Sequence, residues 1–343
     1  MAQRLLPLRD QVIVITGASS GIGLATARMA ASRGARVVMA ARNEDAMRSA
    51  ANEIGAQGGD VHVVGADIGR ESEVARLAQE AISRYGRFDT WVNNAAVSIF
   101  GNTWEVSTPD MQRMFDIVFW HVVWGSRAAM HHYEGRTDSA GSIINIGSLF
   151  GDRTPPLQST YASAKAAEHG FTDALRMELE ANGKPVRVTL IHPGRIDTPF
   201  NDHARAYTKH YPAHHDIVYP PESVAEAILF AAEHGPRDLY VGSQAKAWAV
   251  LGRTAPRLVD KVFGRYLYWG QVDQSRPAPP PEQSALYGPG KPAGQLRGSN
   301  RGMKRRRSYY LELEEHRYLR DGTVVGAVAG SVLGARRLSG ARR

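Results

Sequence analysis

The chain has 343 residues and no cysteine, which excludes disulfide bonds, thiolate nucleophiles and cysteine-ligated metal sites. Its net charge of +8 is uneven, because residues 1–244 hold 23 basic and 27 acidic side chains and residues 245–343 hold 19 and 7. We find no signal-peptide pattern at the N-terminus and no apolar stretch near the ~18–20 residues of a membrane-spanning helix. These features predict a cytoplasmic protein with a strongly basic C-terminal part.

The first predicted element is a strand that runs into a glycine-rich turn. The continuous apolar run VIVIT (12–16) is typical of a buried parallel strand. It is followed by GASSGIG (17–23) and by a predicted helix that ends at Gly34. A strand, a glycine turn and a helix N-terminus form a cradle for a phosphate group, because backbone N–H groups face the anion.

Strands and helices then alternate along the chain. We expect strands at 35–41, 61–67, 88–96, 141–148, 185–194 and 238–242, with helices at 43–59, 71–85, 109–131, 162–179 and 221–234. This alternation predicts an α/β fold: a doubly wound parallel sheet (Rossmann fold) of about seven strands, in a single domain over residues 1–244. Ligands of such sheets bind beyond the carboxyl ends of the strands. Residues 17–23, 67, 93–96, 148 and 193–194 all follow strand ends, so one crevice is expected to collect them.

A possible acid/base pair lies in the stretch that follows the fifth strand. Tyr161 and Lys165 are four residues apart, so a helix places them on one face. A nearby ammonium favours the phenolate, and we therefore expect a lowered pKa for Tyr161. Ser148 ends the preceding strand, where its hydroxyl can hold a substrate oxygen. A Tyr and a Lys at this spacing are, by themselves, equally compatible with a solvated helix face.

The motifs together resemble those of the short-chain dehydrogenase/reductase family over about residues 8–244. They are Thr16-Gly17-x3-Gly21-x-Gly23, Asn93-Asn94-Ala95, Ser148 with Tyr161-x3-Lys165, and Pro193-Gly194 with Thr198. The resemblance implies hydride transfer with a nicotinamide cofactor. It makes Ser148 the holder of the carbonyl oxygen and Tyr161 the proton donor or acceptor, while Lys165 lowers the pKa of Tyr161 and binds the nicotinamide ribose.

The same resemblance places Asp67 and Ile68 at the adenine and Asn94 and Ala95 at the middle of the cofactor. The expected cofactor-binding residues are Thr16, Gly17, Ser19, Ser20, Gly21, Ile22, Gly23, Arg42, Asp67, Ile68, Asn94, Ala95, Tyr161, Lys165, Pro193, Gly194, Ile196 and Thr198. One position departs from the family. Val118 stands where members carry an Asn that anchors a water of the proton relay, and His121 stands where a Gly is usual.

The end of the second strand bears on the choice of cofactor. An acidic residue there accepts both ribose hydroxyls and repels a 2′-phosphate. This chain has Ala41 followed by Arg42, whose planar guanidinium suits a phosphate. We therefore expect NADP(H); the plainer alternative is a solvated arginine at a helix start.

The substrate side is less specific. We expect the pocket to include Leu149, Phe150, Leu157 and Phe200, and the family resemblance places a substrate lid in the long loop after the sixth strand. The loop's His203, His210, His214 and His215 lack a clear set of carboxylate partners, so no metal site is predicted.

Beyond residue 244 we expect an amphipathic helical extension (245–275) and a basic, largely disordered tail (276–343). The extension is expected to lie on an anionic membrane or to cover the crevice or a partner subunit. Residues 276–302 hold eleven Pro or Gly, which predicts disorder. The run Lys304–Arg307 suits acidic lipid, nucleic acid or solvent. The repeat Gly326-x3-Gly330-x3-Gly334 suits close helix packing.

Two functions are compatible with the sequence. The first is an NADP(H)-dependent oxidoreductase that interconverts a carbonyl and an alcohol on a moderately apolar small molecule, with Tyr161 as general acid/base. The second is an NADP(H)-binding sensor with weak turnover, suggested by Val118 and the added tail. In either case we expect a homo-oligomer in the cytoplasm, with peripheral membrane contact as an alternative.

Overall fold

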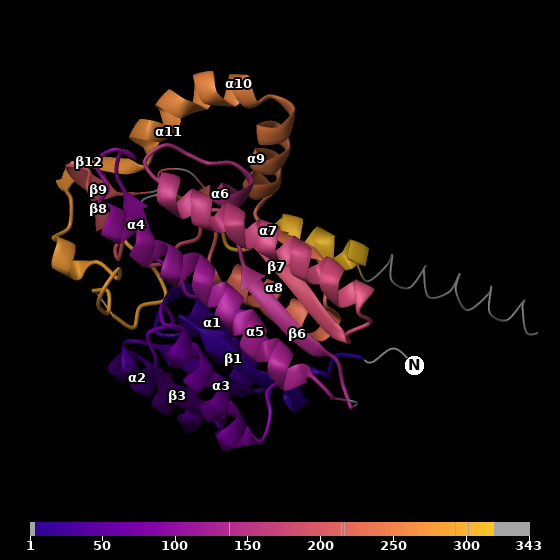
Figure 1. Cartoon of the computed structure of the whole chain (residues 1–343). Helices are drawn as coiled ribbons and strands as arrows, with labels where there is room; N and C mark the ends of the chain where they lie inside the picture. Colours follow the sequence, from indigo (N-terminus) through magenta and orange to yellow (C-terminus); the bar gives the residue numbers. More distant parts are fainter. Residues whose placement is uncertain are drawn as a thin grey trace, which may run out of the picture.

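The structure, a computed structural model, describes residues 4–318 except 137, 214, 216, 292 and 301. Its centre is a sheet of seven parallel strands in the order β11-β7-β6-β4-β1-β2-β3 (Figure 1). The strands are β1 (Val12–Thr16), β2 (Arg36–Ala41), β3 (Val61–Gly65), β4 (Thr90–Asn93), β6 (Gly141–Ile146), β7 (Val186–Pro193) and β11 (Asp238–Val241). The predicted doubly wound α/β fold is confirmed.

Helices cover both faces of this sheet. On one face lie α1 (Gly21–Ser32), α2 (Glu44–Ala56) and α8 (Pro221–His234). On the other lie α3 (Glu71–Tyr85), α4 (Thr108–Phe115), α5 (His121–Tyr133) and α7 (Ser159–Ala181). Every residue of β1 is buried, as its unbroken apolar sequence predicts for a strand covered on both faces. Because the strand order reverses beside β1, a crevice opens at the carboxyl ends of β1 and β4.

The helix expected over residues 109–131 is interrupted by a π-helical turn. Between α4 and α5 the segment η2 (Asp116–Trp120) takes the wider π geometry, and buried Val118 lies at its middle. A π turn inserts an extra residue and so changes which side chains face inward. His121, the first residue after it, is buried with 1% of its surface exposed.

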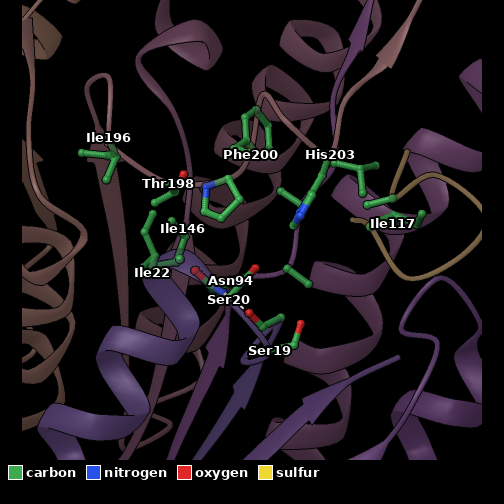
Figure 2. A pocket seen from close by; sticks show the side chains of 18 of the residues that line it. Ser19, Ser20, Ile22, Asn94, Ile117, Ile146, Ile196, Thr198, Phe200 and His203 are labelled. Atoms are coloured by element: carbon green, nitrogen blue, oxygen red, sulfur yellow. Dashed lines mark hydrogen bonds between the residues drawn. The ribbon is translucent and has the colours of Figure 1, made fainter. Parts of the chain in front are cut away.

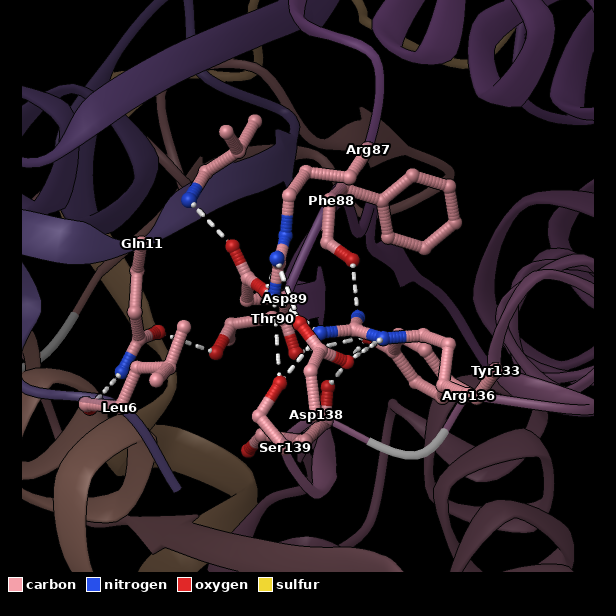
Figure 3. A network of polar contacts seen from close by, with 12 residues as sticks. Leu6, Gln11, Arg87, Phe88, Asp89, Thr90, Tyr133, Arg136, Asp138 and Ser139 are labelled. Carbon is pink, nitrogen blue, oxygen red and sulfur yellow. Dashed lines mark hydrogen bonds and ion pairs between the residues drawn. The ribbon is translucent and has the colours of Figure 1, made fainter. Parts of the chain in front are cut away.

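A polar network joins the strands at the amino ends, away from the crevice (Figure 3). The buried Asp89 carboxylate accepts hydrogen bonds from the Val12 amide at 2.8 Å and from the Arg87 and Arg136 guanidiniums at 2.9 Å. The buried Tyr133 hydroxyl donates to the carbonyls of Asp89 and Ser142, at 3.0 Å each. The network therefore ties β1, β4, β6 and the end of α5 together.

The C-terminal extension forms an arch of helices: α9 (Ser243–Thr254), α10 (Pro256–Leu258), the π-helical η3 (Val259–Phe263) and α11 (Gly264–Gly270) (Figure 1). Its inner side rests on the loop after Ser148, because Trp248 Nε1 donates to the Arg153 carbonyl at 2.9 Å. The outer side exposes Leu258, Tyr266 and Trp269. Among the described residues, no helix is long and apolar enough to cross a membrane. A membrane-surface role for the outer side stays a prediction.

The described part of residues 276–302 differs from one expectation, because this segment, predicted to be disordered, is packed against the domain. After β12 (Val272–Pro277), which pairs with β9 (His210–Pro212), and η4 (Pro281–Gln283), residues 284–300 cross the carboxyl edge of the sheet. We call residues 284–300 the strap. The described residues of the strap form no strand or helix, in line with their Pro and Gly content. Its order comes instead from burial of Leu286 and from hydrogen bonds of its backbone to the domain.

The basic run is held in a similar way. β13 (Met303–Lys304) pairs with β10 (Ile217–Val218), and Lys304 Nζ lies 2.8 Å from a carboxylate oxygen of buried Asp197. Part of the positive charge of the run Lys304–Arg307 is thus neutralised by a carboxylate of the same chain. Its binding to lipid or nucleic acid stays a prediction. The glycine repeat at 326–334 lies outside the described residues.

Candidate active site

A cavity of about 1570 Å³, counting space open to solvent, lies beyond the carboxyl ends of the central strands (Figure 2). It brings together most of the predicted site residues: Gly17, Ser19, Ser20, Gly21, Ile22, Arg42, Asp67, Ile68, Asn94, Ala95, Ser148, Leu149, Phe150, Tyr161, Lys165, Pro193, Gly194, Ile196, Thr198 and Phe200. Three predicted residues, Thr16, Gly23 and Leu157, do not line it.

The glycine turn forms one end of the cavity. Gly17 has a left-handed φ of +68°, and a Cβ there would lie 2.7 Å from the Ala95 Cα. A Cβ on Gly23 would lie 2.3 Å from the Gly17 carbonyl, so this glycine serves the packing of α1 on the turn. Thr16 Oγ1 accepts hydrogen bonds from the amides of Asn94 and Ala95, at 2.9 and 3.1 Å. Thr16 therefore holds the turn against the end of β4, behind the cavity wall.

The residues present fit a dinucleotide. The turn and the N-terminus of α1 supply backbone amides and a positive helix end for a pyrophosphate. A side chain on Gly17 or Gly21 would fill the cradle, since a Cβ on Gly21 would lie 3.1 Å from Thr198. At present the Gly21 amide donates to the Gln295 carbonyl of the strap at 2.9 Å.

The strap also forms part of the cavity wall, where it contributes Ala285, Pro289, Gly290, Ala293 and Gly294. Its composition gave no signal of this role.

Arg42, expected at the 2′-phosphate, reaches this wall. Its guanidinium donates to the Ala285 carbonyl and, at 3.4 Å, to the Leu286 carbonyl. Burial lowers the pKa of Arg42, the charge of Asp67 raises it, and that of Arg113 lowers it. The side chain is thus a cation in the cavity that is bonded to neutral carbonyls.

The three predicted catalytic residues converge in the cavity. Ser148 caps the short helix α6 (Leu149–Asp152), where its Oγ accepts from the Phe150 amide at 3.1 Å. Tyr161 and Lys165 lie one turn apart on α7, with 7% and 2% of their surfaces exposed. The Ser148 hydroxyl lies near enough to the Tyr161 phenol to lower its pKa. The Ser148 hydroxyl, the Tyr161 phenol and the Lys165 ammonium therefore line the same part of the cavity.

The expected lowering of the Tyr161 pKa is not what the environment produces. Burial raises the pKa of Tyr161, and this outweighs the lowering by the Lys165 charge and the Ser148 hydrogen bond, while Glu168 raises it further. Lys165 acts in the expected direction. The pKa of Tyr161 is raised because burial removes the water that would stabilise its phenolate, and because a second charge lies beside Lys165.

That second charge is Glu168, which sequence reasoning missed. Lys165 Nζ donates to Glu168 Oε2 at 2.7 Å and to the Ile146 carbonyl at 2.6 Å. Glu168 has no exposed surface, and burial raises its pKa to about 7 against the lowering effect of Lys165. The i,i+3 spacing from Lys165 was the available signal, but such pairs usually lie on a solvated face.

A histidine behind Ser148 supports the loop that carries it. The Ser148 amide donates to His169 Nε2 at 3.4 Å, and His169 Nδ1 lies 3.6 Å from Asp152. Asp152 also contacts His192 Nδ1 at 2.9 Å. Asp152, His169 and His192 are the one group among the described residues that could hold a metal ion. Their direct Asp–His contact is that of a hydrogen-bonded ion pair. Of the loop histidines, His203 lines the cavity and His214 lies outside the described residues.

Comparisons with known proteins agree with this geometry. The family model for short chain dehydrogenase matches residues 11–209. The uncharacterized oxidoreductase YxnA of Bacillus subtilis is 56% identical over 95% of this chain and 91% of its own length. The chain belongs to the short-chain dehydrogenase/reductase family, whose members are oxidoreductases.

More distant relatives extend the comparison. The putative oxidoreductase SadH of Mycobacterium tuberculosis is 32% identical over 76% of this chain and 98% of its own. A short-chain dehydrogenase/reductase from Burkholderia phymatum, solved in complex with NAD, is 25% identical with a TM-score of 0.67 over 74% of this chain and 96% of that one. An alcohol dehydrogenase from the archaeon Thermococcus sibiricus, solved with 5-hydroxy-NADP, is 25% identical with a TM-score of 0.58 over 67% and 95%. The similarity to YxnA reaches past the domain into the extension.

Proposed function

We propose that this protein is an NADP(H)-dependent oxidoreductase that interconverts a carbonyl and an alcohol on a moderately apolar small molecule. The observation that carries the proposal is the convergence of Ser148, Tyr161 and Lys165 in a cavity that continues to the glycine turn. Structural neighbours solved with NAD and with an NADP derivative support the cofactor class.

The bound cofactor supplies or accepts the hydride. In the reducing direction the Tyr161 O–H donates its proton to the carbonyl oxygen as that oxygen gains charge, and in the oxidising direction Tyr161 accepts a proton from the alcohol. Ser148 Oγ is positioned to hydrogen-bond the same oxygen, since its lone pair already accepts from the Phe150 amide and its O–H is left to donate. The Lys165 ammonium, fixed by two acceptors, lies beside the phenol.

The preference for NADP(H) rests on Arg42. No carboxylate stands at residue 41, and the guanidinium at the end of β2 faces the cavity. Arg42 is bonded to two neutral carbonyls, and a phosphate is a stronger acceptor for it because the bond becomes charge-assisted on both sides. The remaining named residues at the cradle (Ser19, Ser20, Asn94) are neutral hydrogen-bonding groups that suit either dinucleotide.

The substrate end of the cavity is apolar and aromatic. Leu149, Phe150 and Phe200 line it, and the rings of Tyr161 and Phe200 lie 5.5 Å apart. The helical arch lies over the adjoining loop at Arg153. A substrate with an apolar body beside its carbonyl is the best match to these walls.

For the assembly we propose a homo-oligomer in the cytoplasm. An aromatic surface on η2 and α5 exposes Trp120, whose ring stacks on Trp124 at 6.2 Å, and α7 exposes Met177. Large apolar groups gathered on neighbouring helices mark a surface that another chain covers. Size-exclusion chromatography with light scattering, on the parent and on Trp120→Glu, tests this assembly.

The second candidate, a cofactor-binding sensor with weak turnover, is favoured by Val118 at the centre of the π turn. A screen of ketones, aldehydes and alcohols with NADP(H) and NAD(H) separates the two functions. Turnover with NADP(H) on an apolar substrate supports the enzyme. Tight binding of NADP(H) with no turnover across the panel supports the sensor.

A further inference from the structure

The Lys165 ammonium, which lines the cavity, is matched by a buried carboxylate that does not line it. Glu168 Oε2 lies 2.7 Å from Lys165 Nζ, and Glu168 has no exposed surface. Within the described residues it is the one carboxylate in ion-pair contact with this ammonium, and its other oxygen, Oε1, has no hydrogen-bond partner. A carboxylate buried with an oxygen unsatisfied is costly for the fold, so its position beside Lys165 calls for a functional reason.

Buried hydrogen bonds hold the helical turn that carries Glu168. Thr172 Oγ1 donates to the Glu168 carbonyl at 2.8 Å, and Asn145 Nδ2 donates to Thr172 Oγ1 at 2.9 Å. Asn145 in turn accepts from Asn93 at 2.9 Å. A buried chain of hydrogen bonds thus joins the turn of α7 that carries Glu168 to strands β6 and β4.

The charged and titratable groups around Glu168 come from three elements. On α7 they are Lys165 and, more distant, Tyr161, and on β7 His192 acts on Glu168. His121, from α5, faces Lys165. Burial, together with the Lys165 charge, lowers the pKa of His121 to about 3, so this ring is neutral near pH 7. Above its pKa of about 7, Glu168 is therefore the anion that acts on the Lys165–Tyr161 pair.

We propose that Glu168 is a positioning residue of the active site: it holds Lys165 and offsets its charge, so that Tyr161 keeps its proton to higher pH. The proposal rests on the function given above. A protonated Tyr161 is the form that reduces a carbonyl, whereas the phenolate is the form that oxidises an alcohol. The Lys165–Glu168 pair consequently adapts the site to carbonyl reduction at neutral pH and confines alcohol oxidation to alkaline pH.

Glu168→Gln tests this inference because glutamine keeps the shape and an acceptor oxygen but loses the charge. We expect the pH limbs of kcat/KM in both directions to move to lower pH by on the order of one unit, with turnover at the optimum within about tenfold. Glu168→Asp restores the charge, so its limbs should return toward those of the parent. Glu180→Gln, a change at an exposed site on the same helix, should leave the profile unchanged.

The inference would be overturned if the pH limbs of kcat/KM for Glu168→Gln coincided with those of the parent and of Glu180→Gln. A shift of these limbs to higher pH would overturn it as well. If no substrate is turned over, the proposed function fails separately. The titration of Tyr161 is then followed by the phenolate absorbance difference between each Glu168 form and the same form carrying Tyr161→Phe. A lower titration midpoint in Glu168→Gln supports the inference, and an equal midpoint rejects it. Circular dichroism and NADP(H) binding establish that each variant is folded.

Discussion

Arg113 donates through Nη2 to both carboxylate oxygens of Asp67, at 2.7 Å each. Hydrogen bonds and the charge of Arg113 lower the pKa of Asp67 against the raising effect of burial. Through Nε the same guanidinium donates to the Leu286 carbonyl at 3.1 Å. Arg113, on α4, thus joins Asp67, the residue expected at the adenine, to the strap. Leu286 of the strap comes 173 residues after Arg113 in the chain.

Arg113→Ala should weaken cofactor binding, because it releases both the Asp67 carboxylate and the strap. Loss of a charge-assisted hydrogen bond costs roughly 1.5–3 kcal/mol, so the Kd for NADP(H), measured by fluorescence titration, should rise about tenfold or more. Arg127→Ala is the matched control, since Arg127 pairs with Glu71 at 3.4 Å on the exposed surface. Equal Kd values for the two variants would show that the strap contact does not serve the cofactor.

The cofactor preference follows from Arg42. Ala41→Asp with Arg42→Ile places a carboxylate at the ribose and removes the guanidinium, so the preference should move toward NAD(H). We expect the ratio of kcat/KM values for the two cofactors to change about tenfold or more, the worth of one charge-assisted bond. Arg42→Ile alone, as the control, should lose NADP(H) activity without gaining NAD(H) activity. A parent that already prefers NAD(H) would refute the role given to Arg42.

The Asp89 network should matter for stability rather than catalysis. Asp89→Ala removes a carboxylate that is 3% exposed and takes from Arg136, itself 13% exposed, the more buried of its two carboxylate partners, Asp89 and Asp138. Breaking a buried ion pair in this way costs about 3 kcal/mol, which urea unfolding measures. Glu53→Ala, which breaks an exposed pair with Arg28, should change the free energy of unfolding by less than about 1 kcal/mol. Similar losses for both variants would contradict the importance of the network.

Val118 marks the departure from the family's relay. Proton transfer from Tyr161 needs Ser148 and Lys165, both of which are in place, so the parent should be active. We expect Val118→Asn to change turnover by no more than about tenfold, or ~1.4 kcal/mol of barrier. A parent inactive on every carbonyl tried, and activated by this single substitution, would replace the enzyme with a cofactor-binding relative that has lost its relay.

The sheet was predictable because short segments rich in apolar residues, most clearly Val12–Thr16 and Arg36–Ala41, alternate with longer helical patterns. The meeting of Ser148, Tyr161 and Lys165 in one cavity was predictable because their spacing places them at a strand end and on one helix face. The π turn at Val118 was not, since helical periodicity continues on both sides of it. The strap was not predictable either, because its order depends on Arg42 and Arg113, which are far away in sequence.

Glu168 shows a different limit. Its spacing from Lys165 is visible in the sequence, but a glutamate within a long helix is usually solvated. Only the packing of α7 against β6 and η2 makes it a buried charge. The direction of the Tyr161 pKa was mispredicted for the same reason, since burial and a third charge are tertiary properties.

The role of Tyr161 as general acid/base is the central claim, and Tyr161→Phe tests it most directly. The ring and its contact with Phe200 remain while the proton is lost, so the Kd for NADP(H) and the Tm should stay close to those of the parent. Turnover in single-wavelength NADP(H) assays should fall at least ~100-fold, the usual contribution of a general acid. Turnover within a few-fold of the parent, at unchanged cofactor affinity, would remove Tyr161 from the mechanism.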